Sequence, residues 1–303
     1  MKMNPVYKRE TMVSARSFRL ALILVIFNSI LALVILLNMY SVVERVKLTA
    51  EIQYSSFINL YVFVAVVEFV LLMFIMPALT AGSISGERER QTLDILLTTT
   101  MKPSEIIWGK LLSSFSTMFL MVVSSFPLLA VSFVYGGVMV YDVFLLLLCY
   151  LTVALLCGSM GICFSSLFKR STVATVVSYG VLVFIGAGTY AVNIFMLSLA
   201  RMNVNSSYVS SINGVTDQAS SGAWLYLLLL NPVATFYVMI NRQAGDNQVI
   251  NSLNTWFGPH PDNFIMENWV LLSILIQLLL AAIFIFIAVR GVGQSKRRKM
   301  RRK

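Results

Sequence analysis

Residues 57–81 read FINLYVFVAVVEFVLLMFIMPALTA, a run of 25 residues in which Glu68 is the one charged side chain. A helix crosses the hydrocarbon core of a bilayer with about 20 consecutive apolar residues. The stretch that follows, 82–110, reads GSISGERERQTLDILLTTTMKPSEIIWGK and holds eight charged residues. This change of composition predicts a membrane span that emerges into water at its carboxyl end.

Five further apolar runs of similar length lie on either side of this one. The six predicted spans are 20–43, 57–81, 111–134, 143–168, 172–199 and 269–289. The chain is 58% hydrophobic and 12% charged over 303 residues, more apolar than the core of a soluble domain requires. The first run lacks a small-residue cleavage pattern, which favours a retained span over a signal peptide. We therefore expect a single all-α integral membrane domain over 1–303.

Basic residues are distributed unevenly among the connections between these runs. Nineteen of the 23 Lys and Arg residues lie before 20–43, between 57–81 and 111–134, in the connection 169–171, or after residue 289. The other four are Arg45, Lys47, Arg201 and Arg242. The positive-inside rule then places both termini in the cytoplasm of a plasma membrane protein.

A seventh apolar stretch, 223–240, is interrupted by Asn231 and Pro232. If it crossed the membrane, the basic residues would divide into 12 inside and 11 outside, and the charge bias would vanish. We therefore expect a re-entrant or interfacial helix pair on the outer side. A helix can be interrupted at membrane depth where protein, and not lipid, surrounds the non-helical backbone.

Both ends of the chain carry basic residues next to a span. Residues 1–19 mix apolar side chains with Lys and Arg, a composition that favours a helix lying in the membrane interface. The tail 290–303 could bind nucleic acid in isolation, but directly after a span it is expected to lie against anionic lipid. Its predicted lipid-facing residues are Lys296, Arg297, Arg298, Lys299, Arg301, Arg302 and Lys303.

The segment 83–102 carries the signals of a short amphipathic helix. Ser85 or Gly86 is expected to cap it, and Glu87 and Glu89 place negative charge in its first turn. Downstream, Leu93, Leu96, Leu97 and Thr100 recur at three- and four-residue spacing and make one apolar stripe. Such a helix suits a partner's groove. A loop helix that rests on the membrane surface is the alternative.

These residues also resemble a known family. Gly86-Glu87-Arg88-Glu89, the run 92–97 and Lys102-Pro103 leading to Gly109-Lys110 are similar to the permease subunit of ABC transporters of the type II exporter class. In that family the segment is the coupling helix that docks into the ATPase subunit. The resemblance implies a docking role for Gly86, Glu87, Arg88, Glu89, Thr92, Leu93, Asp94, Leu96 and Leu97. One departure is mild, because Asp94 stands where a Glu is common.

The resemblance implies six spans, an N-terminal interfacial helix and a re-entrant element before the last span. It also implies two ATPase subunits, which carry ATP and Mg, and a second permease copy or a related permease. The sequence has no G-x-x-x-x-G-K-[ST] phosphate loop, so we expect no ATPase activity from this chain itself. We expect no metal or cofactor site, since the one histidine, His260, lies in a turn beside no second ligand.

Two other functions compete with an ATP-driven permease. A secondary transporter or channel usually has internal repeats and several intramembrane ionisable groups, and this sequence shows no evident repeat and one such group, Glu68. An intramembrane hydrolase needs a nucleophile with a base, or metal ligands, and no predicted span contains a histidine. The ATP-driven permease is the reading that the residues favour.

Glu68 has two readings of its own. A carboxylate at the centre of a span costs about 2.5 kcal/mol or more in lipid, so this side chain should face protein or water. It could bond structurally to Asn28, Ser124 or Ser125 on a neighbouring helix. It could instead line a substrate path.

Overall fold

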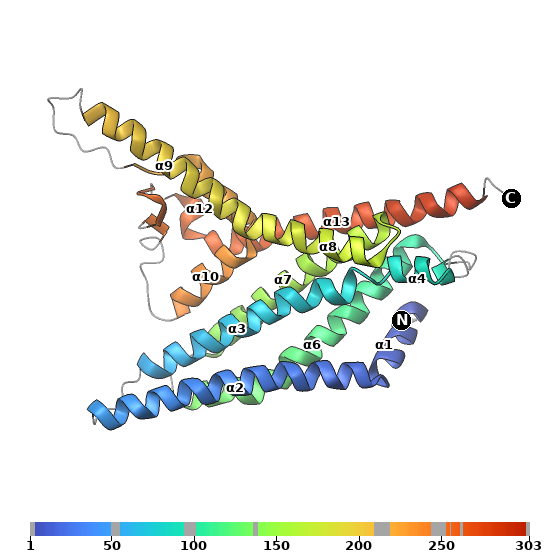
Figure 1. Cartoon of the computed structure of the whole chain (residues 1–303), viewed down its shortest axis with the longest axis horizontal. Coiled ribbons are helices and arrows are strands. Elements are labelled where there is room, and N and C mark those ends of the chain that lie inside the picture. Colours follow the sequence, from blue (N-terminus) through green and yellow to red (C-terminus); the bar gives the residue numbers. More distant parts are fainter. Residues whose placement is uncertain are drawn as a thin grey trace. The chain divides into compact units, whose positions relative to one another are not determined.

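The computed structural model describes residues 4–49, 55–93, 101–135, 139–208, 219–243, 253–254, 256–260 and 263–300. Every regular element within these ranges is a helix (Figure 1). The predicted all-α class is therefore confirmed for the part of the chain that the structure describes.

Within the described ranges, six stretches of helix are long and apolar enough to cross a membrane, and they coincide with the six predicted spans. They are α2 (Phe18–Thr49), α3 (Ser55–Thr80), α6 (Pro103–Tyr135), α7 (Val140–Leu167), the continuous helix of α8 (Ser171–Val183), η1 (Phe184–Gly188) and α9 (Thr189–Tyr208), and α13 (Trp269–Met300). The shorter helices are α1 (Pro5–Ala15), α4 (Ser85–Glu89), η2 (Gly222–Leu230), α10 (Pro232–Gln243) and α12 (Phe264–Glu267).

Two compact units make up the chain. The first comprises residues 1–179 and 279–303, and the second comprises residues 180–278. The expected single domain over 1–303 stays a prediction.

In the first unit, α3 packs against both α6 and α7, and α2 covers α3 and α6. Gly161 of α7 explains the close approach to α3, because any side chain at this position would overlap Thr80. Small residues at helix contacts are the usual means of tight packing in membranes. In the same unit, a cluster of buried apolar residues joins both sides of α4 to the start of α6, the end of α7 and the later part of α13. Its members include Ile84, Leu93, Ile106, Ile107, Leu111, Ile162, Ala288 and Val292.

The N-terminal helix α1 packs along the first turns of α6. A Cβ atom at Gly109 would lie 2.8 Å from Val6 Cβ, so the missing side chain permits this contact. The Asn4 side chain accepts a hydrogen bond from the Val6 N–H at 3.0 Å, caps α1, and donates to the Glu105 carbonyl. Helix α1 is therefore fixed at its start to α6.

The second unit contains the predicted broken helix. Helices η2 and α10 meet at an angle of 94° around Asn231, where Pro232 provides no backbone N–H. The Asn231 amide donates to the Gly186 carbonyl at 2.8 Å and to the Thr189 hydroxyl at 2.9 Å. Gly186 belongs to η1, the π-helical turn between α8 and α9. The Asn231 side chain, at the break of one helix pair, therefore donates to a carbonyl oxygen in an irregular turn of the neighbouring helix. The predicted interruption at Asn231–Pro232 is confirmed.

Candidate functional site

The candidate site is built around α4, directly after α3. Sequence reasoning places the cap of this helix at Ser85 or Gly86, whereas its N-cap is Ile84, which has no side chain able to cap. The Ser165 hydroxyl of α7 accepts from the backbone N–H groups of Ile84 and Ser85, each at 2.9 Å. A residue 80 positions away therefore supplies the cap, and α4 is anchored to α7.

Two consecutive charged residues then fasten α4 to the connection between α7 and α8. Arg88 donates to the Ser166 carbonyl at 2.9 Å and to the Phe168 carbonyl at 3.0 Å, at the carboxyl end of α7. Glu89 accepts from the Ser171 N–H at 2.8 Å and from its hydroxyl at 2.9 Å, at the amino end of α8. A cation at a helix carboxyl end and an anion at an amino end both complement the helix dipole.

The Glu89 contact also changes the acidity of its carboxyl group. The Ser171 N–H lowers the pKa of Glu89 below its ordinary value of 4.5, the Ser171 hydroxyl acts in the same direction, and Arg170 and Arg90 lower it further. Glu89 is exposed, and its carboxylate is nevertheless held in one place by two hydrogen bonds from one residue.

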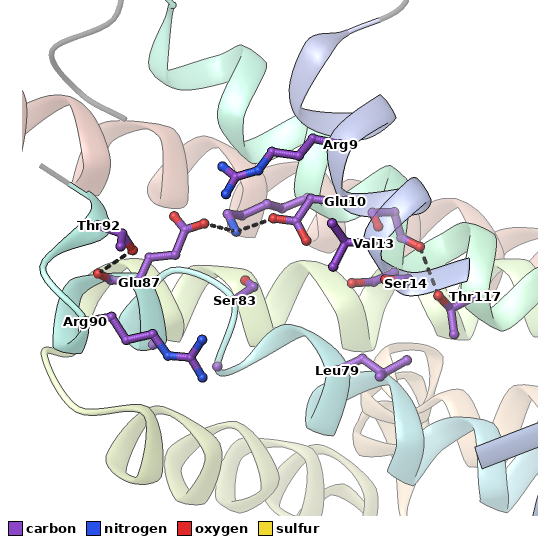
Figure 2. A pocket seen from close by; sticks show the side chains of 15 residues that line it. Arg9, Glu10, Val13, Ser14, Leu79, Ser83, Glu87, Arg90, Thr92 and Thr117 are labelled. Atoms are coloured by element: carbon purple, nitrogen blue, oxygen red, sulfur yellow. Dashed lines mark hydrogen bonds and ion pairs between the residues drawn. The ribbon is translucent and has the colours of Figure 1, made fainter. Parts of the chain in front are cut away.

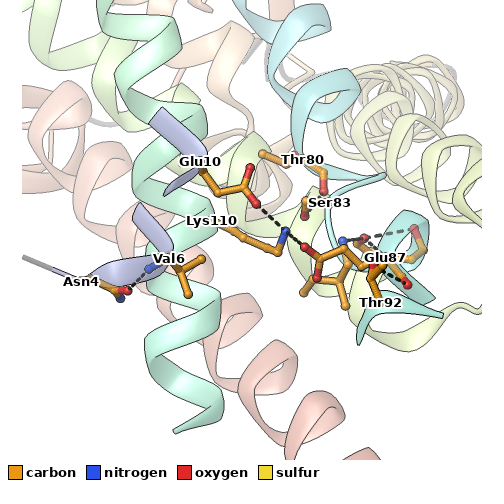
Figure 3. Close-up of polar contacts among 11 residues, drawn as sticks. Asn4, Val6, Glu10, Thr80, Ser83, Glu87, Thr92 and Lys110 are labelled. Atoms are coloured by element: carbon orange, nitrogen blue, oxygen red, sulfur yellow. Dashed lines mark hydrogen bonds and ion pairs between the residues drawn. The ribbon is translucent and has the colours of Figure 1, made fainter. Parts of the chain in front are cut away.

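Glu87 binds the opposite side of the site. Lys110 of α6 is 5% exposed, and its ammonium lies 2.8 Å from Glu87 Oε1 and 3.2 Å from Glu10 Oε1 of α1 (Figure 2; closer view in Figure 3). One buried cation therefore joins α1, α4 and α6. Removing one partner of such a pair is costly, because a buried charge is left uncompensated.

The helix predicted across this segment is interrupted in its described part. Helix α4 ends at Glu89, and Gln91 adopts φ +60°, in the left-handed region that glycine occupies more readily. Thr92 is exposed and donates to the Glu87 carbonyl at 3.2 Å, while Leu93 is 2% exposed in the apolar cluster. Leu93 thus holds the segment to the bundle, and the exposed surface here comes from the four consecutive residues 89–92.

Several predicted site residues lie outside this description. Asp94, Leu96 and Leu97 fall in 94–100, outside the described residues. Helix α13 includes Lys296, Arg297, Arg298 and Lys299, and the structure describes only their backbone. The described part ends at residue 300, before Arg301, Arg302 and Lys303.

Glu68 lies at the contact of three helices of the first unit. Its side chain is fully buried. Ser125 of α6 donates to Oε1, and the Tyr150 hydroxyl of α7 lies 3.4 Å from Oε2 and 3.0 Å from the Ala65 carbonyl oxygen. Ser125 is one of the three partners proposed from the sequence. This arrangement supports a structural role, and the substrate-path reading stays a prediction.

Comparison with known proteins identifies the family. The sequence model described as ABC-2 family transporter protein matches residues 46–290, which are 245 of the 303 residues. The chain belongs to the ABC-2 family of transporter proteins. No curated protein matched the chain. As an ABC-2 member, it is a multi-span membrane protein and the permease subunit of an ABC exporter.

The family match covers part of the candidate site in this ABC-2 permease. It includes the segment 83–102, Lys110, and the connection between α7 and α8, but α1 and the tail lie outside it. Among the described residues, no group of three His, Cys, Asp or Glu side chains could hold a metal ion.

Sequence reasoning included Lys110 in the family-like motif without foreseeing its contacts, and it missed the other residues that hold the segment in place. Lys110, Ser165 and Ser171 are separated from their partners by 23 to 82 positions, and Glu10 by 100. A charged residue at the start of a span was the available signal for Lys110. No local pattern marks the two serines.

Proposed function

We propose that this permease is the membrane-spanning part of an ATP-driven exporter whose ATPase is a separate subunit. The family supports an ABC ATPase as the partner. We further propose two ATPase copies, which bind ATP and Mg, and a second permease or a related one. The absence of a phosphate loop from the sequence supports a division of labour between chains.

The proposal rests on the hydrogen bonds and ion pairs that connect α4 to four other helices. Ser165 and Arg88 connect it to α7, Glu89 to α8, and Glu87 through Lys110 to α6 and α1. A force applied by a partner to the segment 83–102 would therefore reach several helices through charged contacts. Gly86 and Thr92, together with the predicted stripe at Leu96 and Leu97, would face that partner, while Leu93 would anchor the segment.

The proposal includes an orientation. The segment 83–102, both termini and the basic tail would lie on the cytoplasmic side of the plasma membrane, with the tail against anionic lipid. Helix α1 would lie in the interface. The pair η2 and α10 would lie on the outer side without crossing.

Copurification tests the docking role. The tagged permease, expressed in its native host, should retain a protein that carries a phosphate loop, which mass spectrometry would identify. Leu96→Asp with Leu97→Asp should abolish this retention, because two charges would enter the predicted apolar contact. Thr98→Asp with Thr99→Asp is the matched control, since it adds the same charge beside the stripe.

Each result bears on the proposal. Retention lost in the leucine variant and kept in the threonine variant supports docking through this segment. If both variants retain the ATPase and transport normally, the segment is an ordinary loop.

A further inference from the structure

The carboxyl group of Glu68 is enclosed where α3, α6 and α7 meet, and few hydrogen-bond donors reach it. The residue is 0% exposed. The three ion pairs among the described residues do not involve it. Its described hydrogen-bonding partners are two hydroxyl groups, those of Ser125 and Tyr150. An ionised carboxylate offers about four acceptor sites, so two hydroxyl groups at most half fill them.

The Tyr150 hydroxyl group has a nearer acceptor than Glu68. A phenol has one proton to donate. The Tyr150 oxygen lies 3.0 Å from the Ala65 carbonyl oxygen and 3.4 Å from Glu68 Oε2. The longer distance lies outside the range of an O–H···O hydrogen bond, which is about 2.5–3.0 Å. Tyr150 therefore donates to Ala65, and it is not an effective donor to Glu68.

Ser125 also has one proton, and it lies between two possible acceptors. Its Oγ atom is 2.8 Å from the Val122 carbonyl oxygen, one turn earlier in α6, and it contacts Glu68 Oε1. A hydroxyl group can donate one hydrogen bond and accept others. If Glu68 is ionised, Ser125 must donate to it. If Glu68 is protonated, Ser125 donates to Val122 and accepts from Glu68.

The two arrangements of protons differ in their electrostatic cost. In the ionised arrangement, one serine hydroxyl group is the single effective donor to a buried anion. Burying an ion without a countercharge or a full set of donors is expensive, and such a group usually takes up a proton instead. In the neutral arrangement, the protons of Ser125, Tyr150 and Glu68 each meet one acceptor, and no charge is buried.

The titratable groups near Glu68 do not supply a positive charge. Helix α3 brings Tyr61 and α7 brings Cys149 and Tyr150, and Asp142 of α7 acts on Tyr61. These side chains are neutral or negative in any protonation state. Among the described residues, α2 and α6 bring no basic side chain within ion-pair distance of Glu68. The surroundings therefore favour the neutral acid on every side.

We propose that Glu68 is a proton-binding site, at which a neutral carboxylic acid donates its proton to the Ser125 hydroxyl group. This hydrogen bond joins α3 to α6. The bound proton belongs to the packed arrangement of these helices, because contact with water would stabilise the ionised form.

Infrared difference spectroscopy of the purified full-length permease in detergent tests the protonation state. A carboxylic acid has a C=O stretching band that a carboxylate lacks. At neutral pH, the wild-type spectrum minus the Glu68→Gln spectrum should contain this acid band and no carboxylate bands. Glutamine has the shape and the donor of the neutral acid, so the variant should keep the wild-type melting temperature.

Two serine variants identify the acceptor of the proton. Ser125→Ala should shift the acid band to higher wavenumber, because the C=O bond strengthens when the acid loses a hydrogen bond. Ser124→Ala is the matched control. Its hydroxyl group donates to the Met121 carbonyl oxygen and accepts from Asn28, so its loss should leave the band in place.

Several results would overturn the proposal. Carboxylate bands in the glutamine difference spectrum would show that Glu68 is ionised. An acid band that responds to neither serine variant, or equally to both, would remove Ser125 as the acceptor. A glutamine variant that fails to fold would also contradict the neutral acid, which glutamine imitates. None of these measurements depends on whether an ATPase docks on the permease.

Discussion

At the scale of single residues, Glu68 shows how a span tolerates a carboxyl group. The side chain is fully buried by the protein, and Ser125 and Tyr150 lie within hydrogen-bonding distance of its two oxygens. Lipid contact is thereby avoided, and α3 is joined to α6 and α7 by polar contacts. An isolated carboxyl group in such a place can hold helices together without taking part in transport.

Substitution of Glu68 separates its two roles. Glu68→Gln keeps the shape and most hydrogen bonds, so assembly should be unchanged, whereas Glu68→Ala leaves Ser125 and Tyr150 without this partner. Both hydroxyls keep a backbone acceptor, at Val122 and Ala65. The alanine variant should nevertheless melt at a lower temperature in detergent, because deleting a buried side chain leaves a cavity among α3, α6 and α7.

Transport assays complete the comparison. Unchanged transport in Glu68→Gln together with impaired assembly in Glu68→Ala would leave only the structural role. Loss of transport in an intact glutamine variant that still supports ATP hydrolysis would favour the substrate path instead.

The contact between Glu89 and Ser171 predicts a pH dependence. Because the pKa of Glu89 is lowered in the folded protein, its contribution to stability is fully present above the ordinary value of 4.5. It is lost as the pH falls through the lowered value, where the folded carboxylate takes up a proton. The difference in melting temperature between the wild type and Glu89→Gln should therefore shrink at acid pH. A difference that stays constant from neutral to strongly acid pH would contradict this assignment.

At the scale of elements, α4 is too short to be stable as an isolated helix. Its position depends on contacts with neighbouring helices. Ser165 and the end of α7 bind its start and Arg88, and Lys110 of α6 binds Glu87. The connection from α7 to α8 comprises only residues 168–170, and α4 binds both of its ends. The two short segments therefore stabilise each other.

Arg88→Gln tests this mutual support. Hydrogen bonds to charged groups contribute about 1.5–3 kcal/mol, so losing two of them should loosen the α7–α8 connection. Hydrogen exchange should rise about tenfold or more at the Ser171 amide and in the first turn of α8. Arg90→Gln, which removes the same charge two positions later, should leave this exchange unchanged. Equal effects of the two variants would mean that charge, and not the contacts of Arg88, stabilises the connection.

The sequence predicted those elements whose signals are local. Spans follow from the length of apolar runs, and the break at Asn231–Pro232 follows from the chemistry of proline. The interruption at Gln91 was not predicted, because glutamine carries no preference for a positive φ and only surrounding contacts can hold it there. Ser165 and Lys110 act on α4 across long separations in sequence, so no periodicity could reveal them.

At the scale of the whole molecule, the number of crossings decides the orientation of every segment. Among the described residues, six helical stretches qualify by length and composition, and the bent pair of η2 and α10 would make a seventh if it crossed as one span. The bend of 94° and the bonds of Asn231 to Gly186 and Thr189 support a pair that turns back within the second unit. The distribution of basic residues supports the same count independently.

Cysteine accessibility tests this topology directly. Residues 206 and 252 flank the bent pair, so Ser206→Cys and Ser252→Cys should both react with a membrane-impermeant maleimide added outside intact cells. A reporter fused to Lys303 should be active only in the cytoplasm. The native Cys149, Cys157 and Cys163 are buried, so they should react little, and labelling of the unsubstituted protein measures this background.

Reaction of 206 and 252 from opposite sides would mean that η2 and α10 cross the membrane. The tail would then lie outside, the basic residues would divide almost equally between the two sides, and the six-span topology would be wrong, because an even number of crossings is what places both termini in the cytoplasm.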